Sequence, residues 1–494
     1  MKKLYTKAVA ALLIAGSMTS CGDSFLDTDI YNGIDSDTGL NSVTKINVAL
    51  NGAYYRLFYY PFAGNYAISI GDIPTDITYW NQKTSHWNSF YQFSYTDTDS
   101  YLLYIWNYGY KVIDHSSRVI QAAKAIYDNS SASEQAELSL AMAEAYSLRG
   151  YASLILTNVF GHQVKVNGTD FSSQPGIVVV DEPISATDKV NRSTVGESYE
   201  AIINDLKNAI AQYEIVGADQ GSLFYFGKAS TYGLLARASL YLENYSDAIT
   251  YAQNAIDESG ITELHYTAAG YKALYNGGNS NTESMFALDI TESQNWSANS
   301  CGTLWTSYSY SPSPYLLSLY GENDVRRSIM DFGSTSTSTI PVYGGGKFAA
   351  FASGNPAYAT NYIVNAPEMF LIMAEANVRK SSPDVNAAKE ALLVVAKRNL
   401  DITSTADLPA NATQLLSFIK DERARELFQE GHRFWDLRRW DESANLSATG
   451  APNVDYLIKA YQVSNIVFPI PADEINTGSG VEQTPNWGST RPTL

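Results

Sequence analysis

Residues 227–258 read GKASTYGLLARASLYLENYSDAITYAQNAIDE. Ala236, Ala248 and Ala255 are separated by 12 and 7 residues, which places small side chains where two helices cross closely. Leucines and isoleucines recur between them at helical spacing, and Glu243-Asn244 falls at the turn between the helices. The stretch therefore predicts a pair of antiparallel helices in direct contact.

This spacing is that of a tetratricopeptide helix pair, and weaker helical patterns surround it. They cover 141–159, 197–213, 368–379 and 385–400. Because one pair cannot bury its apolar faces alone, we expect several pairs to stack. The sequence predicts a mainly α fold of tetratricopeptide-like helical hairpins with a loop-rich ligand-binding lobe. A generic α-helical domain without repeat order is the alternative.

The composition excludes a disordered chain and disfavours polyanionic partners. Of 494 residues, 45% are hydrophobic, 13% aromatic and only 17% charged. The 33 basic and 51 acidic residues give a net charge of −18, so we expect no nucleic-acid partner. The 36 Tyr, 18 Phe and 8 Trp are more aromatic surface than a core of this size needs.

The first twenty residues predict an export signal. Lysines precede the apolar run 8–16, which is too short to span a membrane, and small and polar residues follow. Met18-Thr-Ser-Cys21 resembles the bacterial lipoprotein box, in which the cysteine becomes acylated. We therefore expect residues 1–20 to be a lipoprotein signal peptide and Cys21 to be the lipidation site. A signal peptide that merely contains a cysteine near its end is the alternative.

Catalytic and metal-binding motifs are missing from the sequence. There is no HExxH, GxSxG or GxxxxGK[ST] pattern, and the five histidines are scattered without metal-ligand spacing. We therefore expect a protein that is not an enzyme, with no catalytic residue, metal or cofactor. Cys301 is expected to be a packed side chain. The pair Asp72/Asp76 leaves a glycosidase as an alternative, which depends on the distance between the carboxylates.

The densest charge pattern, 421–440, is interpreted as structural. Asp421/Arg425 and Glu430/Arg433 have the i,i+4 and i,i+3 spacings of helix-stabilising ion pairs. Phe428, Trp435, Leu437 and Trp440 are then expected to pack beneath the charges.

Aromatic loop residues next to amides are the candidate ligand contacts. An exposed Trp or Tyr offers a flat platform for the apolar face of a sugar, while Asn or Gln binds its hydroxyls. Residues 54–110 hold 19 aromatics, and a second aromatic stretch covers 291–315. The predicted ligand-binding residues are Trp80, Asn81, Trp87, Tyr91, Asn295, Trp296, Trp305 and Tyr308.

Four stretches resemble the SusD/RagB family of outer-membrane lipoproteins. Cys21-Gly-Asp-Ser-Phe-Leu-Asp27 is similar to the family's opening, and Val48-Ala-Leu-Asn-Gly-Ala-Tyr54 to its first helix. The 421–440 block is similar to its most recognisable motif. Phe468-Pro-Ile-Pro471 resembles its C-terminal signature, although the usual residue order is altered in 483–487.

The resemblance implies four regions: the signal peptide, a SusD-like N-terminal region at 21–220, the tetratricopeptide-like pair at 221–260, and a C-terminal region with the ligand lobe at 261–494. It also implies a surface-exposed lipoprotein of the outer membrane in a Bacteroidetes-type bacterium. Such proteins bind an oligosaccharide or polysaccharide and deliver it to a SusC-like TonB-dependent transporter. The alternatives are peptide capture, as in RagB-type members, and a helical-repeat scaffold whose aromatic loops face a protein partner.

Overall fold

The computed structural model describes most of the chain, namely residues 39–185, 187–333, 344–351, 354–444, 446, 461–462 and 465–490. The predicted signal peptide and the predicted lipidation site Cys21 lie outside the described residues.

The fold is mainly α-helical, as the sequence predicts. Its α-helices are α2 (Val43–Phe58), α3 (Tyr66–Asp72), α4 (Asn88–Tyr91), α5 (Ser100–Tyr127), α6 (Ala132–Phe160), α7 (Val195–Val216), α8 (Lys228–Tyr241), α9 (Tyr245–Ser259), α10 (Ala268–Ala273), α11 (Cys301–Thr303), α12 (Pro314–Ser318), α13 (Ala366–Arg379), α14 (Val385–Ala396), α15 (Ala412–Glu426), α16 (Arg433–Trp440), α17 (Ala472–Asn476) and α18 (Trp487–Thr490). Shorter helical turns are η2 (Gly278–Ser280), η3 (Ser297–Asn299), the π-helical η4 (Leu304–Tyr308), η5 (Val325–Ile329), η6 (Pro356–Tyr358) and η7 (Thr405–Asp407).

The strands form small antiparallel pairs that join distant parts of the chain. The pairs are β1 (Thr78–Trp80) with β5 (Tyr310–Pro312), β2 (Lys165–Val166) with β3 (Thr169–Asp170), β4 (Ser284–Leu288) with β6 (Asn361–Asn365), and β7 (Ser443–Ala444) with β8 (Tyr461–Gln462).

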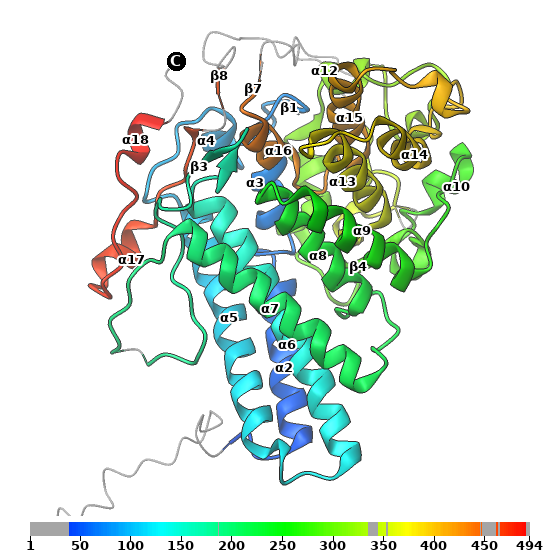
Figure 1. Cartoon of the computed structure of the whole chain (residues 1–494). Helices are drawn as coiled ribbons and strands as arrows, with labels where there is room; N and C mark the ends of the chain where they lie inside the picture. Colours follow the sequence, from blue (N-terminus) through cyan, green and yellow to red (C-terminus); the bar gives the residue numbers. More distant parts are fainter. Residues whose placement is uncertain are drawn as a thin grey trace, which may run out of the picture.

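Long helices α2, α5, α6 and α7 run side by side and form the lower part of the molecule (Figure 1). Capping boxes start two of them, at Ser131/Glu134 for α6 and at Thr194/Glu197 for α7. Helix α6 is buried at every position from 141 to 160, because α2, α5, α7 and α8 pack around it. It is therefore the central helix of this part.

The predicted helix pair in 227–258 is observed as α8 and α9. Ala236, Ala248 and Ala255 are fully buried at the crossing, which confirms the role predicted for small residues there. Helix α13 packs against α9 and against its own partner α14, and α15 follows (Figure 1). The pairs thus stack, as expected for hairpins that cannot bury their apolar faces alone.

The 421–440 block is buried and structural, and its aromatic residues pack as predicted. The ion pairs within it differ from the prediction. Arg425 binds Glu422 at 2.6 Å instead of Asp421, and Glu430 binds Lys347 instead of Arg433.

The Glu430/Arg433 pair is missing because the block is not one continuous helix, whereas Asp421 and Arg425 both lie within α15 and the helix break does not account for their separation. Helix α15 ends at Glu426, and Gly431 turns the chain with a φ of +78° before α16 begins. Arg433 therefore points away from Glu430 and binds Asp76 at 2.9 Å. The i,i+3 spacing predicts a pair only where a helix is unbroken.

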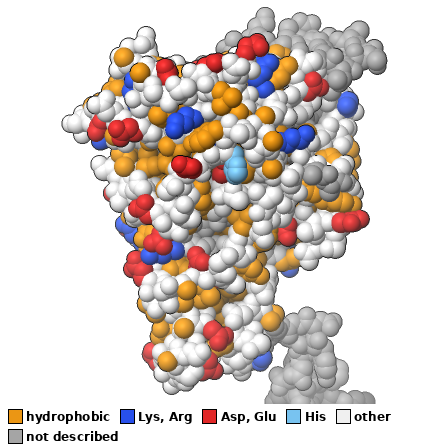
Figure 2. Space-filling model, turned by 90° about the vertical axis from the view of Figure 1, so that its right-hand side faces the viewer, with side chains coloured by type: hydrophobic (Ala, Val, Ile, Leu, Met, Phe, Trp, Pro, Cys, Tyr) orange, Lys and Arg blue, Asp and Glu red, His pale blue; other side chains and the backbone are white. Residues whose placement is uncertain are grey.

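In the part of the chain that the structure describes, no helix combines the length and the apolar character that a membrane crossing requires. On the face shown in Figure 2, acidic, basic and apolar side chains are interspersed, without a broad area of one charge.

Candidate functional site

The structure brings the two aromatic loop regions together, although they lie more than two hundred residues apart in the sequence. Strand β1 pairs with β5 so that Trp80 lies opposite Tyr310. The Tyr310 hydroxyl donates a hydrogen bond to the His86 carbonyl at 2.9 Å, and the hydroxyls of Thr84 and Ser309 are hydrogen-bonded. The 80s and 300s loops therefore form one structural unit.

Most of the predicted contact rings are buried inside this unit. Trp80 is 8% exposed, Trp87 and Trp305 are 1% exposed, and Tyr91 is fully buried. Trp87 stacks on Tyr101 with ring centroids 4.3 Å apart. These four rings are buried in this structure and do not form an exposed platform, and contact of any of them with a ligand stays a prediction.

The two predicted amides are used within their own loops. Asn81 is buried, and its Oδ1 accepts a hydrogen bond from the Lys83 backbone at 3.0 Å. The Asn295 side chain donates to the carbonyls of Thr291 and Glu292 at 3.1 and 2.7 Å. Both side chains fix loop shape in this structure, and contact of either with a ligand stays a prediction.

Two predicted rings remain partly exposed. Tyr308 stacks on the exposed His86, with centroids 5.1 Å apart and planes 20° from parallel. Trp296 lies against Phe58 at 5.0 Å and against Tyr59 at 4.7 Å. Its indole Nε1 is buried and has no hydrogen-bond partner among the described residues.

Trp296 is part of a larger exposed surface that we call the aromatic platform. Three segments contribute to it: the end of α2 with the loop after it, the first turns of α5, and the residue before η3. Its six members are Tyr55, Tyr59, Tyr60, Tyr104, Tyr108 and Trp296.

Tyr59 lies at the centre of the platform. Its ring centroid is 4.9 Å from that of Tyr60, 5.1 Å from that of Tyr108 and 6.2 Å from that of Tyr55. Tyr55 and Tyr104 are 54% and 39% exposed, and the other members are partly exposed. An apolar area of this kind on a protein surface marks a binding site more often than a single exposed ring does.

The platform carries neutral hydroxyl groups and a basic edge. Partial burial, and then neighbouring tyrosines, raise the pKa of Tyr60 and Tyr108 above the ordinary value, so both remain uncharged phenols. The Lys111 ammonium lies 4.3 Å from the centre of the Tyr108 ring. Flat rings flanked by hydroxyls match a sugar, which has apolar C–H faces and a polar rim.

Sequence reasoning missed the five tyrosines of the platform, although a signal was present. Tyr55/Tyr59 and Tyr104/Tyr108 are i,i+4 pairs, so each pair lies on one helix face. On α5 the buried stripe includes Trp106 and Ile113, and the two tyrosines lie outside it. Tyrosines at helical spacing outside the apolar stripe are the pattern to search for.

The acidic pair Asp72/Asp76 is engaged in the fold. The Asp72 carboxylate accepts hydrogen bonds from the backbone N–H groups of Gly431 and Arg433, both at 3.1 Å. Burial raises the pKa of Asp72 to about 6, although these bonds oppose the shift. Asp76 binds the Arg433 guanidinium through both oxygens at 2.9 Å. The glycosidase alternative thus rests on two carboxylates that already have structural partners.

The other expectations concern cysteine and metal. Cys301 is fully buried beside Ser69, as predicted, and burial raises the pKa of its thiol. Among the residues that the structure describes, no group of His, Cys, Asp and Glu side chains has an arrangement that could hold a metal ion.

Comparison with known proteins gives two family matches. Residues 366–487 match the SusD family, and residues 24–242 match a SusD-like family described as starch-binding associating with outer membrane. No curated protein matches the chain in sequence.

Solved structures with the same fold come from Bacteroides species. A SusD superfamily protein from Bacteroides thetaiotaomicron is 22% identical with a TM-score of 0.77, over 90% of this chain and 100% of that one. A putative sugar binding protein and a SusD superfamily protein from Bacteroides vulgatus are 23% and 21% identical. Their TM-scores are 0.78 and 0.79, and the matches cover 90% of this chain and 99% of each of theirs.

The match over 24–242 includes part of the opening, from Ser24, and helix α8, and the match over 366–487 includes the charged block. The stacked helical hairpins and the shared fold agree with them. The two family matches and the shared fold together identify the chain as a SusD-like family protein.

Proposed function

We propose that this protein is a cell-surface glycan-binding lipoprotein that captures an oligosaccharide or polysaccharide and delivers it to a SusC-like TonB-dependent outer-membrane transporter. The single observation that carries the binding function is the aromatic platform around Tyr59 and Trp296. Six rings from three chain segments present an open apolar surface next to hydroxyl groups.

The comparisons support this proposal. One matching family is described as starch-binding and associated with the outer membrane, and one structural relative is described as a putative sugar binding protein. Lipidation at Cys21 would keep the protein at the membrane, since each buried acyl methylene contributes ~0.8 kcal/mol. The net charge of −18 favours a neutral glycan over a polyanionic one.

Binding on the platform would use ring faces and hydroxyls together. A sugar ring laid on Tyr or Trp buries C–H groups that water solvates poorly, and the side chains lose little rotamer freedom. Neighbouring phenols then exchange hydrogen bonds with the sugar hydroxyls. No step of this capture needs a nucleophile or a general acid, which agrees with a binding protein and not with an enzyme.

The test is titration of purified residues 22–494 with neutral oligosaccharides, comparing the double variant Tyr59→Ala/Tyr108→Ala with the unchanged chain. We expect at least an about tenfold loss of affinity, since tenfold corresponds to about 1.4 kcal/mol. The matched control is Tyr251→Ala, which removes a half-buried ring that stacks on Tyr232 on the α8/α9 pair. It should bind like the unchanged chain.

Three results would redirect the proposal. Unchanged glycan affinity in the double variant would reject the platform as the site. Binding of a peptide panel, with no response to any neutral glycan, would favour RagB-type peptide capture. If neither class of ligand binds and the platform variant loses only association with the transporter, the platform is a protein interface.

A further inference from the structure

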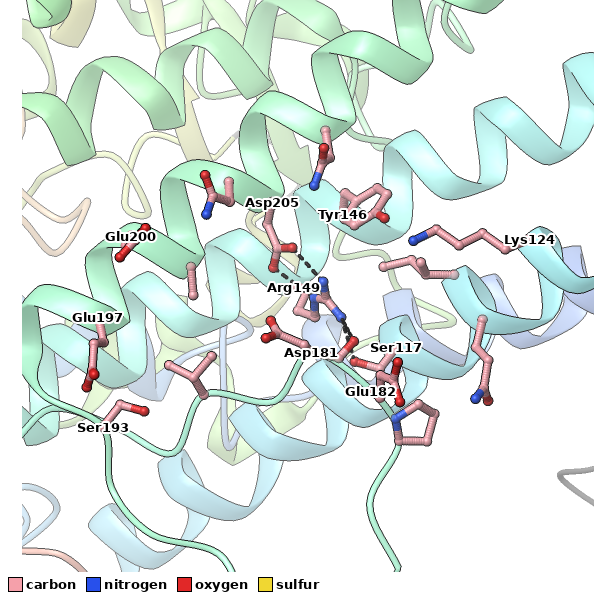
Figure 3. A pocket seen from close by; sticks show the side chains of 17 residues that line it. Ser117, Lys124, Tyr146, Arg149, Asp181, Glu182, Ser193, Glu197, Glu200 and Asp205 are labelled. Atoms are coloured by element: carbon pink, nitrogen blue, oxygen red, sulfur yellow. Dashed lines mark hydrogen bonds and ion pairs between the residues drawn. The ribbon is translucent and has the colours of Figure 1, made fainter.

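A second cavity lies between α5, α6 and α7 (Figure 3). Its volume is about 520 Å³, enough for one or two sugar rings. The extended segment 179–183 closes one side. This segment is held in place by Tyr110, whose hydroxyl donates to the Val178 carbonyl at 3.2 Å and accepts from the Val178 N–H at 2.8 Å.

The floor of the cavity is a buried ion pair with a fixed geometry. Arg149 binds both carboxylate oxygens of Asp205, at 2.8 and 2.6 Å (Figure 3). Its remaining nitrogen donates to the Ser117 hydroxyl at 3.0 Å and to the Asp181 carbonyl at 2.7 Å. The Arg149 guanidinium is therefore already paired, and its hydrogen bonds hold the floor of the cavity in a fixed geometry before a ligand binds.

The Tyr146 hydroxyl at the cavity has no hydrogen-bond partner in the described part of the chain. Tyr146 as a whole is only 5% exposed. Its ring lies between Arg149 and Lys124, whose charged groups are 5.4 and 5.6 Å from the ring centre. The Tyr146 hydroxyl is therefore free to donate or accept a hydrogen bond with a ligand or water in the cavity.

The rim has an excess of negative charge. The carboxylates of Asp181, Glu182 and Glu200 are exposed around the cavity and form no ion pair among the described residues. The fourth rim carboxylate, Glu197, is hydrogen-bonded to Thr194 in the capping box of α7. Lys124 is the single lining cation other than Arg149.

The remaining lining suits a sugar more than a bare cation. The amides of Gln121, Asn204 and Asn208 can exchange hydrogen bonds with hydroxyls, and Ile120 and Ala201 supply apolar wall. No carboxylate group of the described residues is arranged to hold a metal ion. The charge excess therefore favours an organic cation that also carries hydroxyls.

We propose that this cavity is a second ligand site, and that it takes a mono- or disaccharide that carries an ammonium group. The ammonium pairs with the rim carboxylates, the sugar hydroxyls bind the amides and the Tyr146 hydroxyl, and the C–H face lies on Ile120 and Ala201. The site is separate from the aromatic platform, because Ser117 lies nine residues beyond Tyr108 on α5, about 14 Å along the helix. It does not depend on the function proposed above.

The test is calorimetric titration of residues 22–494 carrying Tyr59→Ala and Tyr108→Ala, so that glycan binding at the platform does not contribute. The ligands are a β-1,4-linked glucosamine disaccharide and cellobiose, the neutral disaccharide of the same linkage. We expect saturable binding of the amino sugar and much weaker binding of cellobiose. The variant Asp181→Asn/Glu200→Gln should lose at least about tenfold in affinity, and Tyr146→Phe should lose about fivefold. Thermal melting of each variant shows whether it is folded.

Tyr251→Ala is the matched control, because it removes a half-buried ring on the α8/α9 pair and leaves the cavity lining intact. It should bind the amino sugar as tightly as the chain without this substitution. Equal binding of cellobiose, unchanged affinity in the folded double variant, or no saturation with the amino sugar would each overturn the proposal. Lysine amide binding as tightly as the disaccharide would overturn the assignment to a sugar. A negative result here leaves the platform experiment unaffected.

Discussion

The charged block 421–440 and the aromatic platform differ in how far their side chains are exposed to solvent. In the block, Arg423, Arg433 and Arg439 are buried and bind carboxylates directly. In the platform, uncharged rings such as Tyr55 and Tyr104 remain open to solvent. The dense charges of the block therefore stabilise the fold, whereas the exposed rings of the platform form the candidate binding site.

The difference has a physical cause. A buried charge must be paired, because desolvation otherwise costs several kcal/mol, so its partners leave nothing for a ligand. Burial by itself raises the pKa of Glu422, but Arg326 and Arg425 outweigh it and lower the pKa to about 2. An exposed ring has no such requirement, and its face remains available.

The largest expected effect comes from removing a buried charge next to the block. Arg326 is fully buried and binds Asp324, Glu422 and Glu426 at 2.7, 2.7 and 2.9 Å. Arg326→Met should lower the free energy of unfolding by about 3–5 kcal/mol, because it leaves buried carboxylates without their cation. Urea denaturation measures this change.

The control for this variant is Arg118→Met, which removes one partner of an exposed pair with Asp114 at 2.9 Å. It should change stability by about 0.5 kcal/mol or less. Glycan affinity of folded Arg326→Met should match that of the unchanged chain. A change of less than about 1 kcal/mol in its unfolding free energy would contradict the structural role of the block.

A smaller effect on stability is expected from a carboxyl group that is buried but not fully hydrogen-bonded. Glu144 on α6 is fully buried, accepts a hydrogen bond from Gln220 at 2.7 Å, and has one oxygen without a partner among the described residues. Burial raises its pKa to about 7, although hydrogen bonds from Gln220 and Tyr54 oppose the shift. The folded chain therefore holds the proton more tightly than the unfolded chain, and this carboxyl reduces stability as pH rises from about 4.5 to about 7.

Glu144→Gln should remove that loss and make the chain about 1–3 kcal/mol more stable at about pH 8 than the unchanged chain. Thermal or urea unfolding across this pH range measures the difference. Glu422 has the opposite sign, since its lowered pKa contributes stability that is lost as pH falls from about 4.5 toward 2. A Glu144→Gln curve parallel to that of the unchanged chain would show that burial of this carboxylate carries no pH-dependent cost.

The smallest expected effect distinguishes the contribution of a platform ring to glycan affinity from the contribution of its hydroxyl. Tyr104→Phe keeps the 39% exposed ring and removes one hydroxyl, so glycan affinity should fall by about two- to fivefold, or about 0.5–1 kcal/mol. Tryptophan fluorescence titration measures this, and Tyr104→Ala gives the larger effect of losing the ring. If Phe and Ala lose equally, hydroxyls and not ring faces provide the platform's contribution.

The sequence by itself determined the helical framework. Small residues at Ala236, Ala248 and Ala255 predicted the α8/α9 crossing, and the helical pattern at 368–379 predicted most of α13 (Ala366–Arg379). Helices form through contacts between residues three and four apart, and turns and caps are equally local. A short stretch of sequence is therefore sufficient to predict such features.

Only the tertiary structure decided which aromatic rings stay open and which charges pair. Trp80 and Trp296 both follow the pattern of an aromatic residue beside an amide, yet β1 pairs with β5 and covers the first, while Trp296 remains partly exposed beside Tyr59. Arg433 likewise binds Asp76, a partner more than three hundred residues away. Burial depends on what packs against a side chain from distant segments, and local spacing carries no record of that contact.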